Sequence, residues 1–90
     1  MTIKEFFESE NKLAIRCRSQ EKADLLCLIF DKAGYRWANG ITRYTKSSYY
    51  DRYTSNTCYT NRNTFSDAGY LQSLGYKILE FKDIDIEVKL

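Results

Sequence analysis

The sequence predicts one α+β domain, built from an antiparallel sheet of four to five strands, one main helix and one or two short helices. Ninety residues suffice for one hydrophobic core and leave no room for a second, so residues 1–90 are expected to form a single domain. A stretch of helical period alternates with short runs of β character. The order helix, glycine, tyrosine, strand occurs twice, at Gly34-Tyr35 and at Gly75-Tyr76. This repetition suggests the β-α-β-β-α-β order of ferredoxin-like domains, with the helices on one face of the sheet.

The first eighteen residues predict a short helix and then a strand. Thr2 and Glu5 have the spacing of a capping box, so TIKEFFES is expected to be a helix that lays Phe6 and Phe7 on the core. The run KLAIRCR alternates between apolar and basic residues, which is typical of a strand covered on one side. Its apolar face holds Leu13, Ile15 and Cys17, and its basic face holds Lys12, Arg16 and Arg18.

Residues 20–33 predict the main helix. Ser19 can cap its start, Gly34 supplies the left-handed residue that ends it, and Tyr35 is placed to fold back onto the cap. At 100° per residue, one arc of this helix collects Ala23, Leu26, Cys27, Ile29, Phe30 and Ala33. The opposite arc collects Gln20, Glu21, Asp24, Asp31 and Lys32. Leu28 falls among the charges, either as an ordinary exposed leucine or as a contact point.

The second half of the chain predicts short strands and one short helix. Asn39-Gly40 lies between two β-rich runs and indicates a hairpin, because both turn positions need a positive φ. Residues 45–56 are polar and tyrosine-rich without a clear period, so a long loop or ragged strands are expected. β character resumes in TCYT and TFS, around an Asn-Arg-Asn turn. Ser66 can cap a short helix, DAGYLQSL, which Gly75 closes before the strand YKILEF.

The last residues, DIDIEVKL, alternate without error between charged side chains and Ile84, Ile86, Val88 and Leu90. This pattern predicts a strand with one apolar face, which must pair with a sheet edge. Within one chain, it would add a fifth strand beside the first strand or the hairpin, over the Phe6-Phe7 helix. Alternatively, residues 84–90 would cross a two-fold axis and form a homodimer.

The residue types argue against catalysis, a cofactor or a metal. The chain has no histidine to move protons at neutral pH, and its four glycines are scattered rather than gathered in a phosphate-binding loop. Cys17, Cys27 and Cys58 have no metal-ligand or disulfide spacing, which favours a reduced cytoplasm, and Cys58 is expected to be a half-buried strand residue. No apolar run approaches the roughly 20 residues that span a bilayer, so no membrane association is expected. We therefore expect a cytoplasmic protein that is not an enzyme.

Residues 33–63 contain six tyrosines, the only tryptophan and five basic residues, against a single acidic residue, Asp51. Several of the rings are expected to pack on the main helix, as aromatic residues of a sheet commonly do. The part YTKSSYYDRYTSN has instead the composition of antibody binding loops, in which rigid rings give contact area at little entropic cost. A protein partner is therefore favoured. The candidate contact residues are Tyr44, Lys46, Tyr49, Tyr50, Arg52, Tyr53 and Leu28.

The alternative is a small nucleic-acid-binding or nucleotide-sequestering module that uses the basic, tyrosine-rich segment 35–62. Aromatic rings stack on bases, Arg and Lys meet phosphates, and ferredoxin-like sheets include a major RNA-binding module. The signature of that module is a Lys/Arg-Gly-aromatic-Gly/Ala-Phe run, and NTCYTNRN does not resemble it. The net charge of +2 is also low for this function, which we rank second.

The runs AGYRWANG and YLQSLGYKILEFKDI resemble a group of small bacteriophage and prophage proteins that share the pattern GYkWxxG... GYxIIxF. The resemblance spans about residues 12–84 and is carried by cap and core positions, namely Gly34, Tyr35, Trp37, Gly40, Gly75, Tyr76, Ile78 and Phe81. It implies a shared fold more directly than a shared activity. It further implies a phage-type inhibitor in the bacterial host cell, such as an anti-CRISPR protein that binds an effector nuclease. With 14 basic and 12 acidic residues, the chain is not expected to imitate DNA over its whole surface, so a blocked hinge, domain interface or assembly surface fits better.

Overall fold

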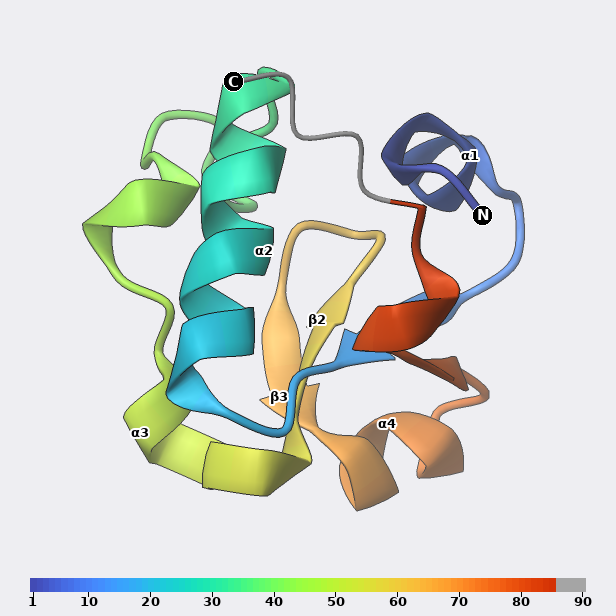
Figure 1. Ribbon diagram of the computed structural model, residues 1–90. Coiled ribbons are helices and arrows are strands. Elements are labelled where there is room, and N and C mark those ends of the chain that lie inside the picture. Colours follow the sequence, from blue (N-terminus) through green and yellow to red (C-terminus); the bar gives the residue numbers. More distant parts are fainter. Residues whose placement is uncertain (86–90) are drawn as a thin grey trace.

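A four-stranded mixed sheet runs through the centre of the protein in the computed structural model, which describes residues 1–85 (Figure 1). The strands lie in the order β3-β2-β1-β4. Antiparallel pairing joins β1 to β2 and β2 to β3, whereas β1 and β4 run parallel. The bounds are Leu13–Arg16 for β1, Thr57–Thr60 for β2, Phe65–Asp67 for β3 and Lys77–Glu80 for β4.

Four α-helices accompany the sheet in residues 1–85, and this confirms the predicted α+β class. Their bounds are Ile3–Glu8 for α1, Gln20–Lys32 for α2, Tyr50–Tyr53 for α3 and Ala68–Ser73 for α4. Three single 3₁₀ turns complete the elements, η1 at Tyr44–Lys46, η2 at Thr54–Asn56 and η3 at Phe81–Asp83. The structure thus contains more short helices than the one or two expected.

The sheet is mixed rather than antiparallel because of the path that the chain takes through α4. β3 and β1 run in the same direction, since both are antiparallel to β2. The α4 crossover carries the chain from the β3 edge to the opposite edge, where β4 runs parallel to β1. A helical crossover of this kind returns the chain in its original direction. The expected ferredoxin-like sheet is therefore not reproduced.

The two faces of the sheet are both covered, although helices on one face only were expected. We call the side that packs on α1 and α2 the first face. Its core cluster contains Phe6, Leu13, Ile15, Cys17, Ala23, Leu26, Cys27, Phe30, Trp37, Tyr44, Tyr59 and Ile84. The second face packs on α4, and its smaller cluster contains Ala14, Cys58, Ala68 and Leu71. Ala14 is 0% exposed, so β1 is buried on both faces and not on one, as its alternation suggested.

Both Gly-Tyr pairs end a helix in the same way, as the sequence predicts. Gly34 has φ +93°, and the N–H of Tyr35 donates to the carbonyl of Phe30 over 3.1 Å. Gly75 has φ +91°, and the N–H of Tyr76 donates to the carbonyl of Leu71 over 3.0 Å. With the second bond from each glycine N–H, these are Schellman motifs. The tyrosine after each glycine packs against the core of its own face.

Three helix starts were predicted, and two of them are found where expected. Thr2 and Glu5 form the capping box, since each accepts the backbone N–H of the other through its side chain. Ser19 caps α2 by accepting the N–H of Lys22. The third prediction was one residue early, because Asp67, and not Ser66, caps α4. Ser66 is taken up by β3, where it pairs with Cys58.

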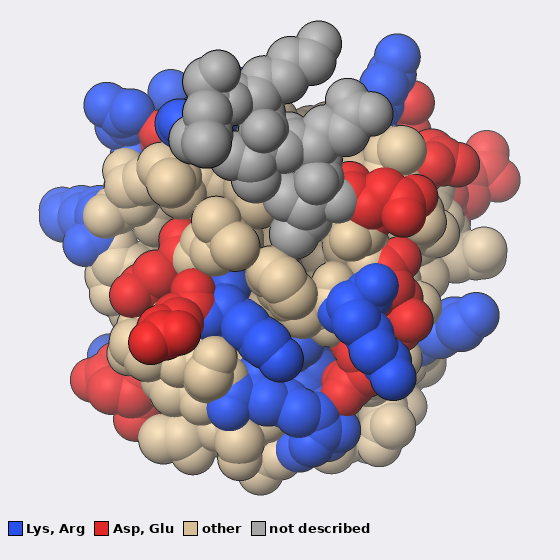
Figure 2. All heavy atoms as spheres, in the orientation of Figure 1, with Lys and Arg blue, Asp and Glu red and all other residues tan. Residues whose placement is uncertain are grey.

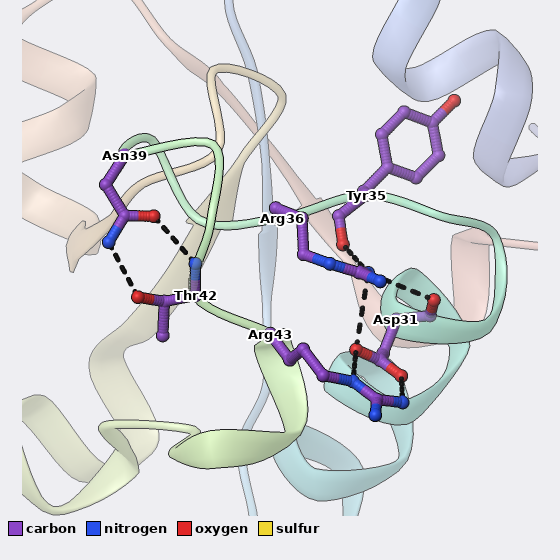
Figure 3. A network of polar contacts seen from close by, with 6 residues as sticks. All are labelled: Asp31, Tyr35, Arg36, Asn39, Thr42 and Arg43. Carbon is purple, nitrogen blue, oxygen red and sulfur yellow. Dashed lines mark hydrogen bonds and ion pairs between the residues drawn. The ribbon is translucent and has the colours of Figure 1, made fainter.

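The segment after α2 is a compact loop rather than the expected hairpin of two strands. Only the isolated bridge between Arg36 and Arg43 has β pairing. Gly40 has φ +74°, but Asn39 does not have the positive φ that the expected turn requires. The side chain of Asn39 instead accepts the N–H groups of Ile41 and Thr42, both over 2.9 Å. Figure 3 shows the bond from Thr42. A local Asx turn therefore replaces the strand ladder.

Asp31 fastens this loop to α2, although helical period places it on the solvent-facing arc. Its side chain is 4% exposed and receives two hydrogen bonds from Arg43, of 3.0 and 2.7 Å (Figure 3). Arg36 lies 3.4 Å from the same carboxylate and also donates to the carbonyl of Tyr35. Hydrogen bonds from Arg43, together with the charges of both arginines, hold the pKa of Asp31 below its ordinary value. Two basic residues of the tyrosine-rich segment are thus used to hold the fold.

Beyond η3, Ile84 joins the core of the first face and is 5% exposed. The N–H of Asp85 donates to the carbonyl of Met1 over 2.8 Å, and Asp85 forms a parallel bridge with Thr2. The expected last strand therefore begins beside the N-terminal residues rather than beside β1 or a hairpin. Its remainder, residues 86–90, and with it the predicted dimer contact, lies outside the described residues.

Candidate functional site

An open groove lined by aromatic side chains lies beside the edge strand β3, with a volume of about 300 Å³. Tyr49 and Phe65 stack with their ring centroids 4.7 Å apart and an interplanar angle of 2°. Trp37 meets both rings edge-on, at 5.4 Å from Tyr49 and 5.7 Å from Phe65. We call this the aromatic groove. Its lining residues are Trp37, Ala38, Asn39, Tyr49, Asn63, Thr64 and Phe65.

The backbone that carries Tyr49 is strained on both sides of α3. Tyr49 has φ +54°, and Thr54, a β-branched residue, has φ +49°. Positive φ costs on the order of 1–3 kcal/mol at such residues, and it persists only where the surroundings enforce it. Ser48 is one such constraint, because its carbonyl accepts the hydroxyl of Tyr59 over 2.6 Å and its side chain accepts Gln20 over 2.9 Å. Ser48 is thus anchored to α2 and β2, and the residues that follow it form the short helix α3, where a loop or ragged strands were expected.

The structure divides the predicted contact residues between core and surface. Tyr44 is 0% exposed, with its ring against Trp37 and Phe30, so it cannot contact a partner and that prediction was wrong. Burial also raises its pKa. Tyr50 is half-buried and packs against the core of the first face. The ring of Tyr44 packs on Phe30 of α2 because η1 follows the loop that Asp31 fastens to this helix.

The remaining predicted residues are on the surface, but they do not form one patch around the groove. Tyr53 is 39% exposed and its ring lies 6.1 Å from Phe65, so it borders the aromatic groove. Arg52 and Lys46 are exposed. Leu28 is 39% exposed on α2 and is not among the groove residues.

Phe65 is the central groove residue that the sequence analysis did not single out. It lies in β3, a strand of only three residues, which is too short for a periodic pattern to tell which side chains are covered. Its partner in β2 is Tyr59, on the face of the sheet that packs on α2. Only the pairing of β2 with β3 brings Phe65 beside Tyr49.

A second hollow, of about 350 Å³, lies where the parallel strands β1 and β4 end, beside the start of α2. We call it the basic depression, and Figure 2 shows Lys and Arg side chains gathered there in the lower centre of the face. Its lining residues are Arg16, Arg18, Lys22, Glu80, Phe81 and Lys82. Within residues 1–85, four basic side chains and one carboxylate line it, which is a local excess of three positive charges, more than the +2 of the whole chain.

The arginines of the basic depression are oriented by neighbouring elements. Arg16 donates to the carbonyl of Ser55 over 2.8 Å and to the side-chain oxygen of Asn56 over 2.6 Å. Arg18 forms an ion pair with Glu80, with 2.5 Å between nitrogen and oxygen. The alternation in KLAIRCR places Arg16 and Arg18 on the basic face of their strand but indicates no role for them. A further signal was Lys22, because a cation in the first turn opposes the helix dipole.

The buried thiols give no sign of a reactive nucleophile. Cys58 is 0% exposed, so the expectation that it is half-buried was wrong. α4 covers it on the second face of the sheet. Burial raises the pKa of the Cys58 and Cys27 thiols to about 12, where little thiolate exists at neutral pH.

Across residues 1–85 there is no group of three or more His, Cys, Asp or Glu side chains placed to hold a metal ion. Among the helices in that range, none is long and apolar enough to cross a membrane. No protein-family model matches the chain, and neither a curated protein nor a solved structure is significantly similar to it. These comparisons therefore assign no function to the chain.

Proposed function

We propose that this protein is a non-catalytic inhibitor that binds a protein partner stoichiometrically through the aromatic groove and the adjoining helix α3. The observation that supports it is the stack of Tyr49 on Phe65 beside Trp37, in which Tyr49 has a strained backbone. Tyrosine, tryptophan and arginine are the residues most enriched among interface hot spots. A rigid aromatic surface loses little conformational entropy when a partner binds.

The indole N–H of Trp37 adds support for an occupant of the groove. Its Nε1 is buried and has no hydrogen-bond partner in residues 1–85. A buried donor without an acceptor costs about 1–3 kcal/mol. A partner that brings a carbonyl or hydroxyl oxygen into the groove, with a small shift of the indole, would relieve this cost.

The class of partner that we propose is a bacterial defence protein, foremost a CRISPR effector nuclease. This choice is supported by the resemblance to small phage proteins at Gly34-Tyr35 and Gly75-Tyr76. Charge favours a mode other than DNA mimicry, because basic residues outnumber acidic ones by 14 to 12. The protein would occupy a hinge or assembly surface of the nuclease.

The test is inhibition of a panel of purified CRISPR effector nucleases, with Tyr53→Ala and Arg52→Ala as variants. For the sensitive nuclease, we expect each variant to weaken inhibition by about 10-fold or more, since hot-spot truncations cost upwards of about 2 kcal/mol. Tyr70→Ala is the matched control, because Tyr70 is a 59% exposed tyrosine on α4, away from the groove. All three variants should keep the melting temperature of the parent. Equal losses for Tyr70→Ala and Tyr53→Ala would contradict the proposed surface.

Nucleic acid remains the alternative partner, and the structure makes segment 35–62 a weaker site for it than its composition suggested. Arg36 and Arg43 are engaged by Asp31, which leaves Lys46, Arg52 and Arg62 as the unpaired cations of that segment within residues 1–85. Titration of a labelled single strand at two salt concentrations decides the matter. Binding that falls steeply with salt would favour nucleic acid, because it would report displaced counterions.

A further inference from the structure

The basic depression carries an inference that is independent of the aromatic groove and of the proposed inhibition. Its residues come from the end of β1, the first turn of α2 and the end of β4 with η3, so they meet only in the fold. The carboxyl ends of parallel strands, next to the start of a helix, form a common binding place for phosphorylated ligands in α/β folds. We propose that the basic depression binds a nucleotide.

The charges of the depression fit a phosphate chain. Four ion pairs occur in residues 1–85, and neither Lys22 nor Lys82 takes part in one of them. Arg16 uses two of its five donors on Ser55 and Asn56, so three remain for an anion. The Arg18-Glu80 pair places a further guanidinium in the lining. A ligand with several negative charges complements this set better than a single carboxylate does.

The size and the single aromatic residue of the depression favour a nucleotide over a bare phosphate. A volume of about 350 Å³ lies at the lower end of the range found for small-molecule sites. Phe81 is half-buried, packs against the core of the first face and lines the depression, so the exposed part of its side chain is the apolar surface available to a base. Base–aromatic stacking contributes about 1–3 kcal/mol per base. In this assignment the lysines and arginines meet the phosphates and Phe81 meets the base.

Calorimetric titration with three probes, without magnesium and at low salt, separates the contribution of the phosphates to binding from that of the base. The probes are ATP, inorganic tripolyphosphate and adenosine. We expect ATP to bind at least about 10-fold more tightly than tripolyphosphate, and adenosine not to bind. Phe81→Leu should bring ATP to the affinity of tripolyphosphate. Equal affinity of the two phosphates for the parent protein, or no ATP binding at millimolar concentration, would overturn the proposal.

Charge variants locate the site. Lys22→Gln with Lys82→Gln should weaken ATP binding by about 10-fold or more, since charged hydrogen bonds contribute about 1.5–3 kcal/mol each. The double variant Lys46→Gln with Arg62→Gln is the matched control, because it removes two positive charges outside the depression and should leave ATP affinity within about twofold. All four positions are exposed, so these variants test the site even if Phe81→Leu is unstable. Equal losses in both double variants, or single-stranded DNA that binds and is not displaced by ATP, would refute a nucleotide site here.

Discussion

The two faces of the sheet are covered by helices with the same ending but very different cores. On the first face, α2 runs for 13 residues and contributes to a cluster of twelve buried residues that is rich in aromatic rings. On the second face, α4 runs for 6 residues over a cluster of four small or medium side chains. Both helices end in a glycine at positive φ followed by a tyrosine. The glycine cap therefore determines where each helix ends. Helix length and side-chain size determine how much each face contributes to the stability of the fold.

The two cores are therefore expected to contribute unequally to the stability of the protein. The first face buries the large rings and thus supplies most of the hydrophobic stabilisation, which scales with the apolar area removed from water. The second face buries four small or medium side chains and therefore contributes less. We expect substitutions on the second face to lower the stability of the protein less than substitutions on the first face.

The largest effect is expected from truncation of Phe30. Its carbonyl accepts the hydrogen bond from the N–H of Tyr35 that closes α2. Phe30 is 0% exposed and packs on the rings of Phe6, Phe7 and Tyr44. Phe30→Ala should lower the free energy of unfolding by about 3–5 kcal/mol, because it leaves a cavity in the larger core. Guanidinium denaturation followed by circular dichroism gives this value.

Leu71 is the matched position on the second face, because its carbonyl accepts the hydrogen bond from the N–H of Tyr76 that closes α4. Leu71→Ala should cost about 2 kcal/mol, because fewer neighbours surround the leucine and α4 can settle into part of the space. The same denaturation experiment applies. If Leu71→Ala destabilises the protein as much as Phe30→Ala does, the two faces contribute equally to stability.

The caps themselves should respond alike on both faces. A Cβ added at Gly34 or Gly75 would meet no atom within 4 Å, so the cost of alanine comes from the positive φ alone. We expect Gly34→Ala and Gly75→Ala each to destabilise by about 1–2 kcal/mol. Thermal melting of the two variants checks this. A large difference between them would show that burial, rather than backbone conformation, controls these positions.

The Asp31 anchor on the first face should make stability depend on acid. Its folded pKa lies below the ordinary 3.8, chiefly because Arg43 donates hydrogen bonds to the carboxylate. The stabilisation is therefore fully present above about pH 3.8 and is lost as the pH falls through the lower folded value. The stability difference between the parent and Asp31→Asn should be constant near neutral pH and shrink below pH 3.8. In an Arg43→Ala background, the shrinkage should move closer to that value, and an unchanged profile would contradict the pairing.

The smallest expected effect is a difference in the rates at which a thiol reagent labels the three cysteines, and it involves no change in the stability of the protein. Cys58 lies under α4, whereas Cys17 and Cys27 lie in the core of the first face. If the second face opens more readily by local unfolding, a thiol reagent should label Cys58 before the other two under native conditions. Mass spectrometry of peptides from a labelling time course measures the order. Equal rates at all three cysteines would indicate that the faces open together.

Features decided within a few residues were predictable from the sequence. The Thr2-Glu5 capping box, the start of α2 at Ser19 and both glycine caps depend on local φ angles and on hydrogen bonds between near neighbours. The β2-β3 hairpin also follows from its turn, where Asn63 has φ +62°. For the candidate site, composition pointed to Tyr49, Arg52 and Tyr53, and the structure places Tyr49 in the lining of the aromatic groove. Composition could not separate them from Tyr44, because burial is not a local property.

Only the tertiary structure decided how distant segments meet. The parallel pairing of β1 with β4 depends on which sheet edge the α4 crossover reaches, and no local pattern records this. The same holds for Asp31, which changes from a surface charge to a buried anchor once Arg43 folds over it. Phe65 beside Tyr49, and Lys82 beside Lys22, are likewise brought together by strand order. Sequence by itself determined the caps of α2 and α4 to within one residue, since these depend on near neighbours. The aromatic groove and the basic depression arise from long-range packing, which local propensity does not encode.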